Sequence, residues 1–259
     1  MDLGIKGRRA IVCAASRGLG RASAFSLARN GADLVVNGRD EQVLEETAQA
    51  IREETGVAVE AVPGDISDPS VQAAMIETSP EPDILVNNNG GPPRRDFREI
   101  DRDAFLQGVV MNMATPVEMI GRVVDGMAER GFGRIVNITS ISVKMPVPGL
   151  DLSSGARAGL TAFVAGIASG VAPSNVTINN LLPGYFDTDR LRSNIAAGAS
   201  ATGADLTKFT AQQMASVPAK RFGDPDEFGE ACAFLCSAQA GYITGQNLVI
   251  DGGRYSSVW

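Results

Sequence analysis

A glycine-containing turn near the start of the chain has the residue types needed to bind a phosphate. The apolar run at residues 10–15 leads into Ser16, Arg17, Gly18, Leu19 and Gly20, and a helical pattern follows. Glycines between a strand and a helix let the backbone approach a pyrophosphate, which the helix N-terminus can then bind. A turn that serves the fold alone is the alternative, but the order strand, turn, helix favours a dinucleotide site.

The end of the second apolar run indicates which dinucleotide would bind. Asn37 is followed by Gly38 and Arg39, with no carboxylate placed to bind both hydroxyls of an NAD ribose. Arg17 and Arg39 can instead flank a ribose 2′-phosphate, because a guanidinium matches phosphate geometry. Two solvated surface arginines are the alternative. We predict NADP(H) as the cofactor, in preference to NAD(H).

The elements that must position these residues follow a regular alternation. Between helix-like stretches lie short, nearly continuous apolar runs at residues 10–15, 32–37, 57–62, 83–87, 134–139, 177–182 and 247–250. Such runs predict a parallel sheet covered on both faces. We therefore expect an α/β fold: one Rossmann-like, doubly wound domain over residues 1–259. Residues 187–218 lack a strand and are expected to form a small helical lid that sets substrate specificity.

Composition excludes several classes of function. The net charge of −7 disfavours nucleic acid and anionic membranes as partners, and Arg94 and Arg95 are interpreted as an isolated, solvated pair. No histidine is present, so serine–histidine triads and most metal sites are excluded, and we expect no metal. Cys13, Cys232 and Cys236 are expected to be core thiols. No apolar run has the length of a secretory or transmembrane segment, so we expect a cytoplasmic protein.

With these residues in hand, the chain resembles the classical short-chain dehydrogenase/reductase family, including bacterial 3-oxoacyl-carrier-protein reductases, over nearly its full length. The resemblance implies a cofactor site, a substrate-orienting serine and a C-terminal strand and turn. The matching residues are Asp65 and Ile66, the run Asn87, Asn88, Asn89 and Gly90, the helix residue Asn112, Ser140, the segment with Pro183, Gly184 and Thr188, and residues 242–253.

The same resemblance exposes two departures. Ala14 replaces the first fingerprint glycine, which crowds the turn only mildly if its φ is negative, so we expect weaker but surviving cofactor binding. Counting 13 positions from Ser140, the family's usual spacing, gives Ser153 where the family has its proton-donating tyrosine. Four positions further, Arg157 replaces the lysine that lowers the pKa of that tyrosine and binds the ribose. Serine is too short and too weak an acid to substitute, whereas Arg157 keeps the positive charge and could still bind the ribose hydroxyls.

Another residue must supply the proton if reduction is fast. Tyr185 is the best replacement candidate, and Lys144 and Asp151 lie in the loop between Ser140 and the helix, although each has a structural or solvent-facing alternative. Ser140 could instead cap the segment after its strand, and Asn112 could satisfy nearby backbone groups.

Three functions fit these residues. The leading hypothesis is an NADP(H)-dependent oxidoreductase acting on a small-molecule carbonyl or alcohol, with a 3-oxoacyl thioester as one candidate substrate and with modified proton delivery. A non-redox lyase, aldolase or isomerase could use Ser140, Arg157 and Tyr185 to stabilise an enolate or oxyanion. A nucleotide-sensing protein without catalysis is the third. The resemblance also implies a homotetramer, with interfaces on the Ser153 helix and on the C-terminal strand and tail near residues 255–259. The stripe with Leu160, Phe163, Val164, Ile167 and Val171 is a contact candidate on that helix, although burial in the core of the chain would give the same pattern.

Overall fold

A single parallel sheet organises the computed structural model, which describes residues 2–257. Its seven strands lie in the order β3-β2-β1-β4-β5-β6-β7, and every neighbouring pair is parallel. The strands are β1 (Arg9–Val12), β2 (Asp33–Gly38), β3 (Val59–Pro63), β4 (Ile84–Asn87), β5 (Gly133–Ile138), β6 (Val176–Pro183) and β7 (Asn247–Ile250). The predicted doubly wound α/β fold is confirmed, and each predicted strand overlaps an observed one.

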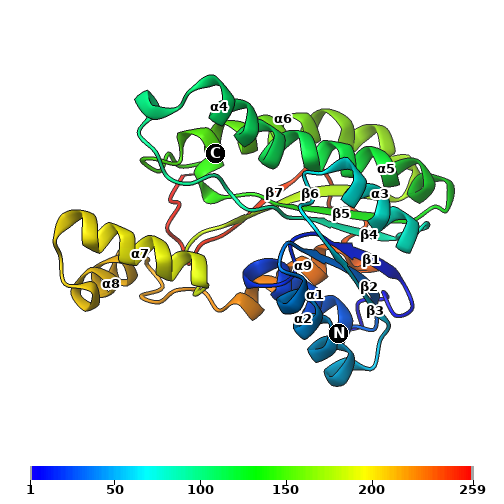
Figure 1. Ribbon diagram of the computed structural model, residues 1–259. Coiled ribbons are helices and arrows are strands. Elements are labelled where there is room, and N and C mark those ends of the chain that lie inside the picture. The colour runs from blue at the N-terminus through cyan, green and yellow to red at the C-terminus, as the bar shows by residue number, and fades with distance from the viewer. Residues whose placement is uncertain (1, 258–259) are drawn as a thin grey trace.

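Helices cover both faces of the sheet (Figure 1). The helices α1 (Gly18–Arg29), α2 (Glu41–Thr55) and α9 (Pro225–Leu235) lie on one side. On the other side are α3 (Pro69–Thr78), α4 (Arg102–Val109), α5 (Thr115–Glu129) and α6 (Asp151–Val171). Each face buries its own apolar cluster, one against α1 and α9 and one against α5 and α6. The nearly continuous apolar strands follow directly from this burial on two sides.

The segment predicted as a lid consists of two helices that extend away from the sheet (Figure 1). They are α7 (Asp189–Thr202) and α8 (Leu206–Ala215), which pack against each other. Thr188 caps α7, because its side-chain oxygen accepts a hydrogen bond from the backbone N–H of Leu191. The cap fixes the point at which the chain leaves β6 and enters the lid.

One expectation about apolar length is wrong. Residues Asp151–Ser174, which comprise α6 and the following turn, have the length and mean hydropathy to cross a bilayer. The sequence shows no continuous apolar run here, because glycines and serines interrupt the alanines and large apolar side chains that give the segment its hydropathy. Leu160, Val164 and Ala168 of α6 are buried in the core cluster, and the helix packs on β6.

The proposed contact stripe on α6 is also largely wrong. Leu160 and Val164 are fully buried, and Ile167 and Val171 pack against the same core cluster. Only Phe163 is exposed, at 39%. The apolar spacing therefore reflects burial within the chain, and the tail residues Val258 and Trp259 lie outside the described residues.

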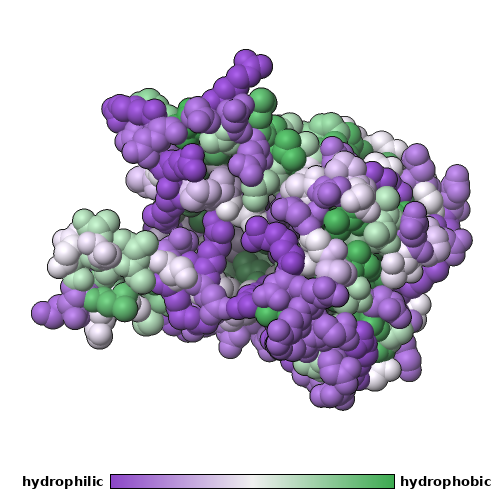
Figure 2. Space-filling view, viewed as in Figure 1, coloured by the Kyte–Doolittle hydropathy of each residue, from purple (hydrophilic) through white to green (hydrophobic). Residues whose placement is uncertain are grey.

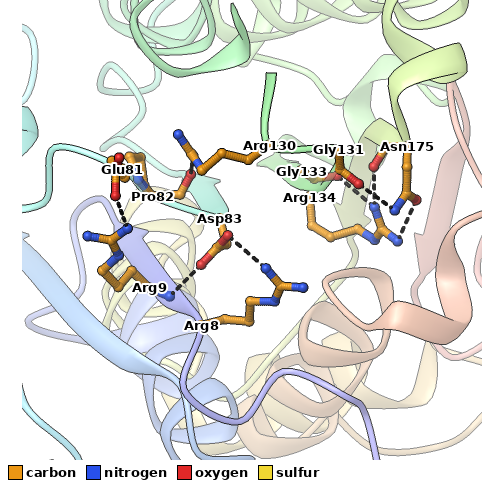
Figure 3. A network of polar contacts seen from close by, with 10 residues as sticks. All are labelled: Arg8, Arg9, Glu81, Pro82, Asp83, Arg130, Gly131, Gly133, Arg134 and Asn175. Carbon is orange, nitrogen blue, oxygen red and sulfur yellow. Dashed lines mark hydrogen bonds and ion pairs between the residues drawn. The ribbon is translucent and has the colours of Figure 1, made fainter. Parts of the chain in front are cut away.

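A buried arginine joins three segments at the edge of the sheet away from the carboxyl ends of the strands (Figure 3). Arg134 on β5 is 1% exposed, and its guanidinium donates to the carbonyls of Ser237 and Asn175, each at 2.8 Å. Burial lowers its pKa, and the stack on Phe132 at 4.3 Å compensates part of the lost hydration. Arg134 thus anchors the turns before β6 and after α9.

Candidate functional site

A cavity of about 530 Å³ opens at the carboxyl ends of the strands. The loops after β1 to β6 line it, together with the start of α7. Figure 2 shows the hollow between the lid and the body of the molecule, with hydrophilic residues at its rim and hydrophobic ones in its depth. Ligands of doubly wound sheets bind at this edge, where the strand order reverses between β1 and β4.

The structure brings nearly all the predicted site residues to this one cavity. Two predicted residues, Gly20 and Asn112, do not line it and instead lie behind residues that do. The predicted residues on its wall are Ser16, Arg17, Gly18, Leu19, Arg39, Asp65, Ile66, Asn88, Gly90, Ser140, Ser153, Arg157, Pro183, Gly184, Tyr185 and Thr188.

Gly20 is required for packing within the glycine turn. A Cβ at this position would lie 2.3 Å from the carbonyl oxygen of Ala14 and 2.7 Å from the Asn88 amide nitrogen. That same amide donates to the Ala14 carbonyl at 3.2 Å. Absence of a side chain at Gly20 therefore lets α1 begin close against β1 and β4, which aims the N-terminus of α1 at the cavity.

Ala14 departs from its expected conformation. The φ of Ala14 is +45°, in the left-handed region, so the assumption of a negative φ is wrong. The chain must turn sharply here, which also ends β1 at Val12 and leaves Cys13 just outside the strand. An alanine methyl in this region is strained, where a glycine would not be.

Replacing Ala14 by glycine is expected to raise the free energy of unfolding by about 0.5–1 kcal/mol. The gain is the relieved strain less the extra backbone entropy that glycine adds to the unfolded chain. Urea denaturation measures it, with Ala50→Gly inside α2 as a control that should lose about 1 kcal/mol. A lower free energy of unfolding in the Ala14→Gly protein would contradict the claim that the backbone is strained at Ala14.

A buried hydrogen-bonded chain surrounds Ser153 at the deep end of the cavity. Ser153 Oγ donates to Asn112 Oδ1 at 3.1 Å and accepts a bond from Arg157 Nε at 3.1 Å. Asn112 lies in a π-helical turn between α4 and α5 (Val110–Ala114), and its amide donates to the Gly90 carbonyl at 3.1 Å. Because serine has a single hydroxyl proton, its donation to Asn112 leaves none for a molecule in the cavity.

Arg157 carries the positive charge nearest to this serine. Its Nη1 donates to the Ile138 carbonyl at 2.8 Å, and the residue is 9% exposed. Burial, and secondly the charge of Arg190, lower its pKa to about 10. That value lies above neutral pH, so the guanidinium stays charged at pH 7 and keeps donors free toward the cavity.

Ser140 and Tyr185 face the cavity from opposite loops. Ser140 accepts a hydrogen bond from the Ser142 N–H, so it caps the turn after β5, as its structural alternative predicted, while still lining the cavity. Tyr185 lies with its ring under the Arg254 guanidinium at 4.0 Å. The other two proton-donor candidates, Lys144 and Asp151, are exposed and do not line the cavity.

Three arginines at the cavity went unrecognised as site residues in the sequence. Arg94, Arg190 and Arg254 all line it, and Arg94 is exposed, as interpreted from the sequence, while also forming part of the cavity wall. Arg190 donates to the carbonyls of Gly91 and Pro92, and one buried nitrogen of Arg254 has no hydrogen-bond partner. The only feature of the sequence that could have indicated them is their position, because each follows a segment that leaves the carboxyl edge of the sheet.

The cysteines are core residues, as predicted. Cys13, Cys232 and Cys236 are free and buried, and burial raises the pKa of Cys13 to about 12. Across residues 2–257, no three side chains of the metal-binding types gather closely enough to hold an ion.

Comparison with known proteins identifies the family of the chain. The family model described as "Enoyl-(Acyl carrier protein) reductase" matches residues 13–254. Nodulation protein G of Azospirillum brasilense is 34% identical, with 94% of this chain and 96% of the relative covered. The 3-oxoacyl-[acyl-carrier-protein] reductase FabG of Vibrio cholerae is 32% identical, with coverages of 98% and 99%.

A solved structure agrees with these sequence matches. The L-sorbose reductase of Gluconobacter frateurii, crystallised with NADPH and L-sorbose, superposes with a TM-score of 0.94 at 28% identity, with both chains fully covered. On the matched sequence and the shared fold together, the chain belongs to the short-chain dehydrogenase/reductase family.

Proposed function

We propose that the protein is an NADP(H)-dependent oxidoreductase that acts on a small-molecule carbonyl or alcohol. The observation that carries the proposal is one continuous cavity. Its lining includes the glycine turn with Arg17 and Arg39, and also Ser140, Ser153 and Tyr185. A dinucleotide bound along this wall would bring its reactive end to the three hydroxyl-bearing residues.

The residues present fit such a cofactor. Gly18 has a φ of +58°, so the turn adopts a conformation that favours glycine and exposes backbone N–H groups at the start of α1. Arg17 and Arg39 would hold the 2′-phosphate. Arg17 Nη2 lies 3.6 Å from Asp40 Oδ2, and both of these side chains are exposed. Asp65 accepts the Ser67 N–H, and with Ile66 it would contact the adenine. The related L-sorbose reductase was crystallised with NADPH, which supports this choice of cofactor.

Ser153 and Arg157 replace, in this proposal, the tyrosine and lysine of the family. The hydrogen bonds of Ser153 support a positioning role for it, because its hydroxyl donates to Asn112 and accepts from Arg157. Arg157 would bind the ribose hydroxyls with its remaining N–H groups and supply positive charge beside the reacting oxygen. Asn112 would fix the position of Ser153 relative to the backbone at Gly90, because it bonds both.

Reduction then needs two tasks from the chain beyond cofactor binding. The cofactor, when bound, supplies the hydride. Ser140, whose oxygen accepts from Ser142, keeps its own proton to donate to the substrate oxygen and so orient the carbonyl. Tyr185 is the proposed proton donor, because its ring lines the cavity and no hydrogen bond engages its hydroxyl among residues 2–257.

Two measurements test the function. NADPH fluorescence on adding protein reports binding, and NADPH oxidation is then followed across ketones and 3-oxoacyl thioesters. Binding with turnover supports the proposal. Binding without turnover indicates a nucleotide sensor, whereas no binding together with carbon–carbon bond cleavage of a β-hydroxy carbonyl indicates a lyase or aldolase.

Substituting Arg39 by methionine is expected to weaken NADPH binding roughly 10-fold to 100-fold and leave NADH binding unchanged. The reason is the loss of charge-assisted hydrogen bonds that only the 2′-phosphate can accept. Calorimetric titration of both dinucleotides measures the effect, with Arg52→Met on α2 as a control whose side chain points away from the cavity and bonds Val59. Equal losses for NADPH and NADH would contradict the assigned role.

We also propose a cytoplasmic homotetramer that closes its lid, residues 187–218, over the substrate. Exposed apolar side chains on α4 and its continuation support association, with Phe105, Leu106 and Val110 between 43% and 53% exposed. At the other side, β7 is an edge strand with Leu248 at 41% exposed, and the tail from Tyr255 follows it. Light scattering that shows a monomer would contradict this assembly.

A further inference from the structure

The substrate end of the cavity contains more positive charge than a dinucleotide site requires. Besides Arg17 and Arg39 at the glycine turn, the wall carries Arg94, Arg157 and Arg190. Arg254 adds a fourth guanidinium at this end, above the Tyr185 ring. The chain as a whole is acidic, with a net charge of −7, so this concentration of arginine is local.

Among the described residues, no acidic side chain forms an ion pair with these four arginines. Asp189, which also lines the cavity, is paired with Arg192 at 2.8 Å. One Arg254 nitrogen is buried without a partner. Like charges gathered without a counterion repel one another, and a bound anion relieves this repulsion.

Arg190 is held close to the reacting end. Its Nη2 donates to the carbonyls of Gly91 at 3.3 Å and Pro92 at 3.4 Å, which fixes the guanidinium beside the loop after β4. A Cβ on Gly91 would lie 2.9 Å from that Nη2 and 3.7 Å from Ser153 Oγ. Arg190 and Ser153 therefore both lie close to Gly91, so an anion bound by Arg190 would lie near Ser153.

The electrostatic environment agrees with this geometry. Burial lowers the pKa of Arg190, and the charge of Arg94 lowers it further. The charge of Arg190 in turn lowers the pKa of Arg157. The three guanidinium groups thus interact with one another in sequence from the exposed rim, where Arg94 lies, to the buried Arg157.

We infer that the substrate is an oxo acid or hydroxy acid, whose carboxylate lies beside the reacting carbon and is bound by Arg190 and Arg94. This inference rests on the proposed oxidoreductase function and narrows it to a substrate class. A carboxylate accepts two parallel N–H bonds from one guanidinium, which fixes the orientation of the adjoining carbonyl. An uncharged ketone or ester lacks that contact.

Binding of matched acids and esters to the protein tests the inference. Acetoacetate and pyruvate are titrated calorimetrically against their methyl esters, once without cofactor and once with saturating NADPH. The acids are expected to bind at least about 10-fold more tightly than the esters, because charge-assisted bonds are lost on esterification. Equal binding of acid and ester would overturn the inference.

Two variants and two matched controls assign the effect to residues. Arg190→Met and Arg94→Met are expected to reduce the preference for acid over ester to within about 2-fold. Arg221→Met and Arg98→Met remove exposed arginines that do not line the cavity and that are paired with Glu227 and Asp96, so both variants should keep the preference. A preference that survives in Arg190→Met overturns the inference.

The cofactor and phosphate arms separate the remaining explanations. If Arg190→Met weakens NADPH binding as much as acid binding, the arginine serves the cofactor and the inference fails. If inorganic phosphate displaces acetoacetate more strongly than pyruvate does, the site binds a phosphate-bearing substrate, and the carboxylate assignment fails. Failure of the wild-type protein to bind NADPH would contradict the proposed function, while the acid-to-ester ratio without cofactor still decides whether the carboxylate site exists.

Discussion

A protein that carries Ser153→Tyr and Arg157→Lys together is expected to reduce carbonyl substrates roughly 10-fold to 10²-fold faster than the wild type. The gain stays below most of the roughly 10²-fold to 10⁴-fold range of a positioned general acid, because Tyr185 is already proposed to donate the proton in the wild type. Ser153 lines the cavity, so a phenol at this position would project toward the substrate oxygen. The lysine would replace the Arg157 guanidinium with a compact ammonium that can approach the new phenol and lower its pKa. The rate of NADPH oxidation measures the gain.

The single variants separate the two contributions. Ser153→Tyr alone leaves Arg157 bonded to the Ile138 carbonyl and should gain less than the double variant. Ser153→Ala removes the donor to Asn112 without adding an acid, and should change the rate less than the tyrosine does. If the folded double variant is no faster than wild type, either the assigned positions or the redox role is wrong.

Replacing Arg134 by methionine is expected to lower the free energy of unfolding by about 2–4 kcal/mol. The guanidinium donates to the carbonyls of Ser237, Asn175 and Gly133, and methionine fills the space without supplying a donor. Buried carbonyls left without partners account for most of the loss. Urea denaturation at neutral pH measures it.

Arg9→Met is the matched control for this substitution. Arg9 lies on the same edge of the sheet but is 41% exposed and pairs with the exposed Glu81 (Figure 3). Such a surface pair contributes at most about 1 kcal/mol. Comparable losses of unfolding free energy in the two variants would mean that the buried hydrogen bonds of Arg134 stabilise the protein no more than an exposed ion pair does.

The fold could be predicted from the sequence because its signals are local. Each strand is visible in the sequence as a short apolar run, and the lid as a long stretch without such a run. The predicted and observed strands therefore differ only in where they begin and end. The end of β1 moved because Ala14 takes a positive φ, which alanine rarely adopts and no pattern indicates. The α6 stripe was ambiguous for another reason, since burial in the core and burial in an interface demand the same spacing.

The candidate site could be predicted only in part. Residues at the ends of strands were found, because parallel strands bring their carboxyl ends to one edge. The direction of the Ser153 hydrogen bond could not be found, since it depends on Asn112 from another helix. Arg94, Arg190 and Arg254 were missed because an arginine in a loop has the same appearance whether it is solvated or faces a cavity. Only the folded structure shows that these arginines line one cavity and that, within residues 2–257, none of them is paired with a carboxylate.

Calorimetric titration of the protein with NADPH and with NADH tests the central claim most directly, because every proposed role depends on a dinucleotide in this cavity. Saturable heat from NADPH, with an affinity at least about 10-fold above that for NADH, is the predicted result. Absence of heat from both dinucleotides at concentrations that saturate related reductases would contradict the account.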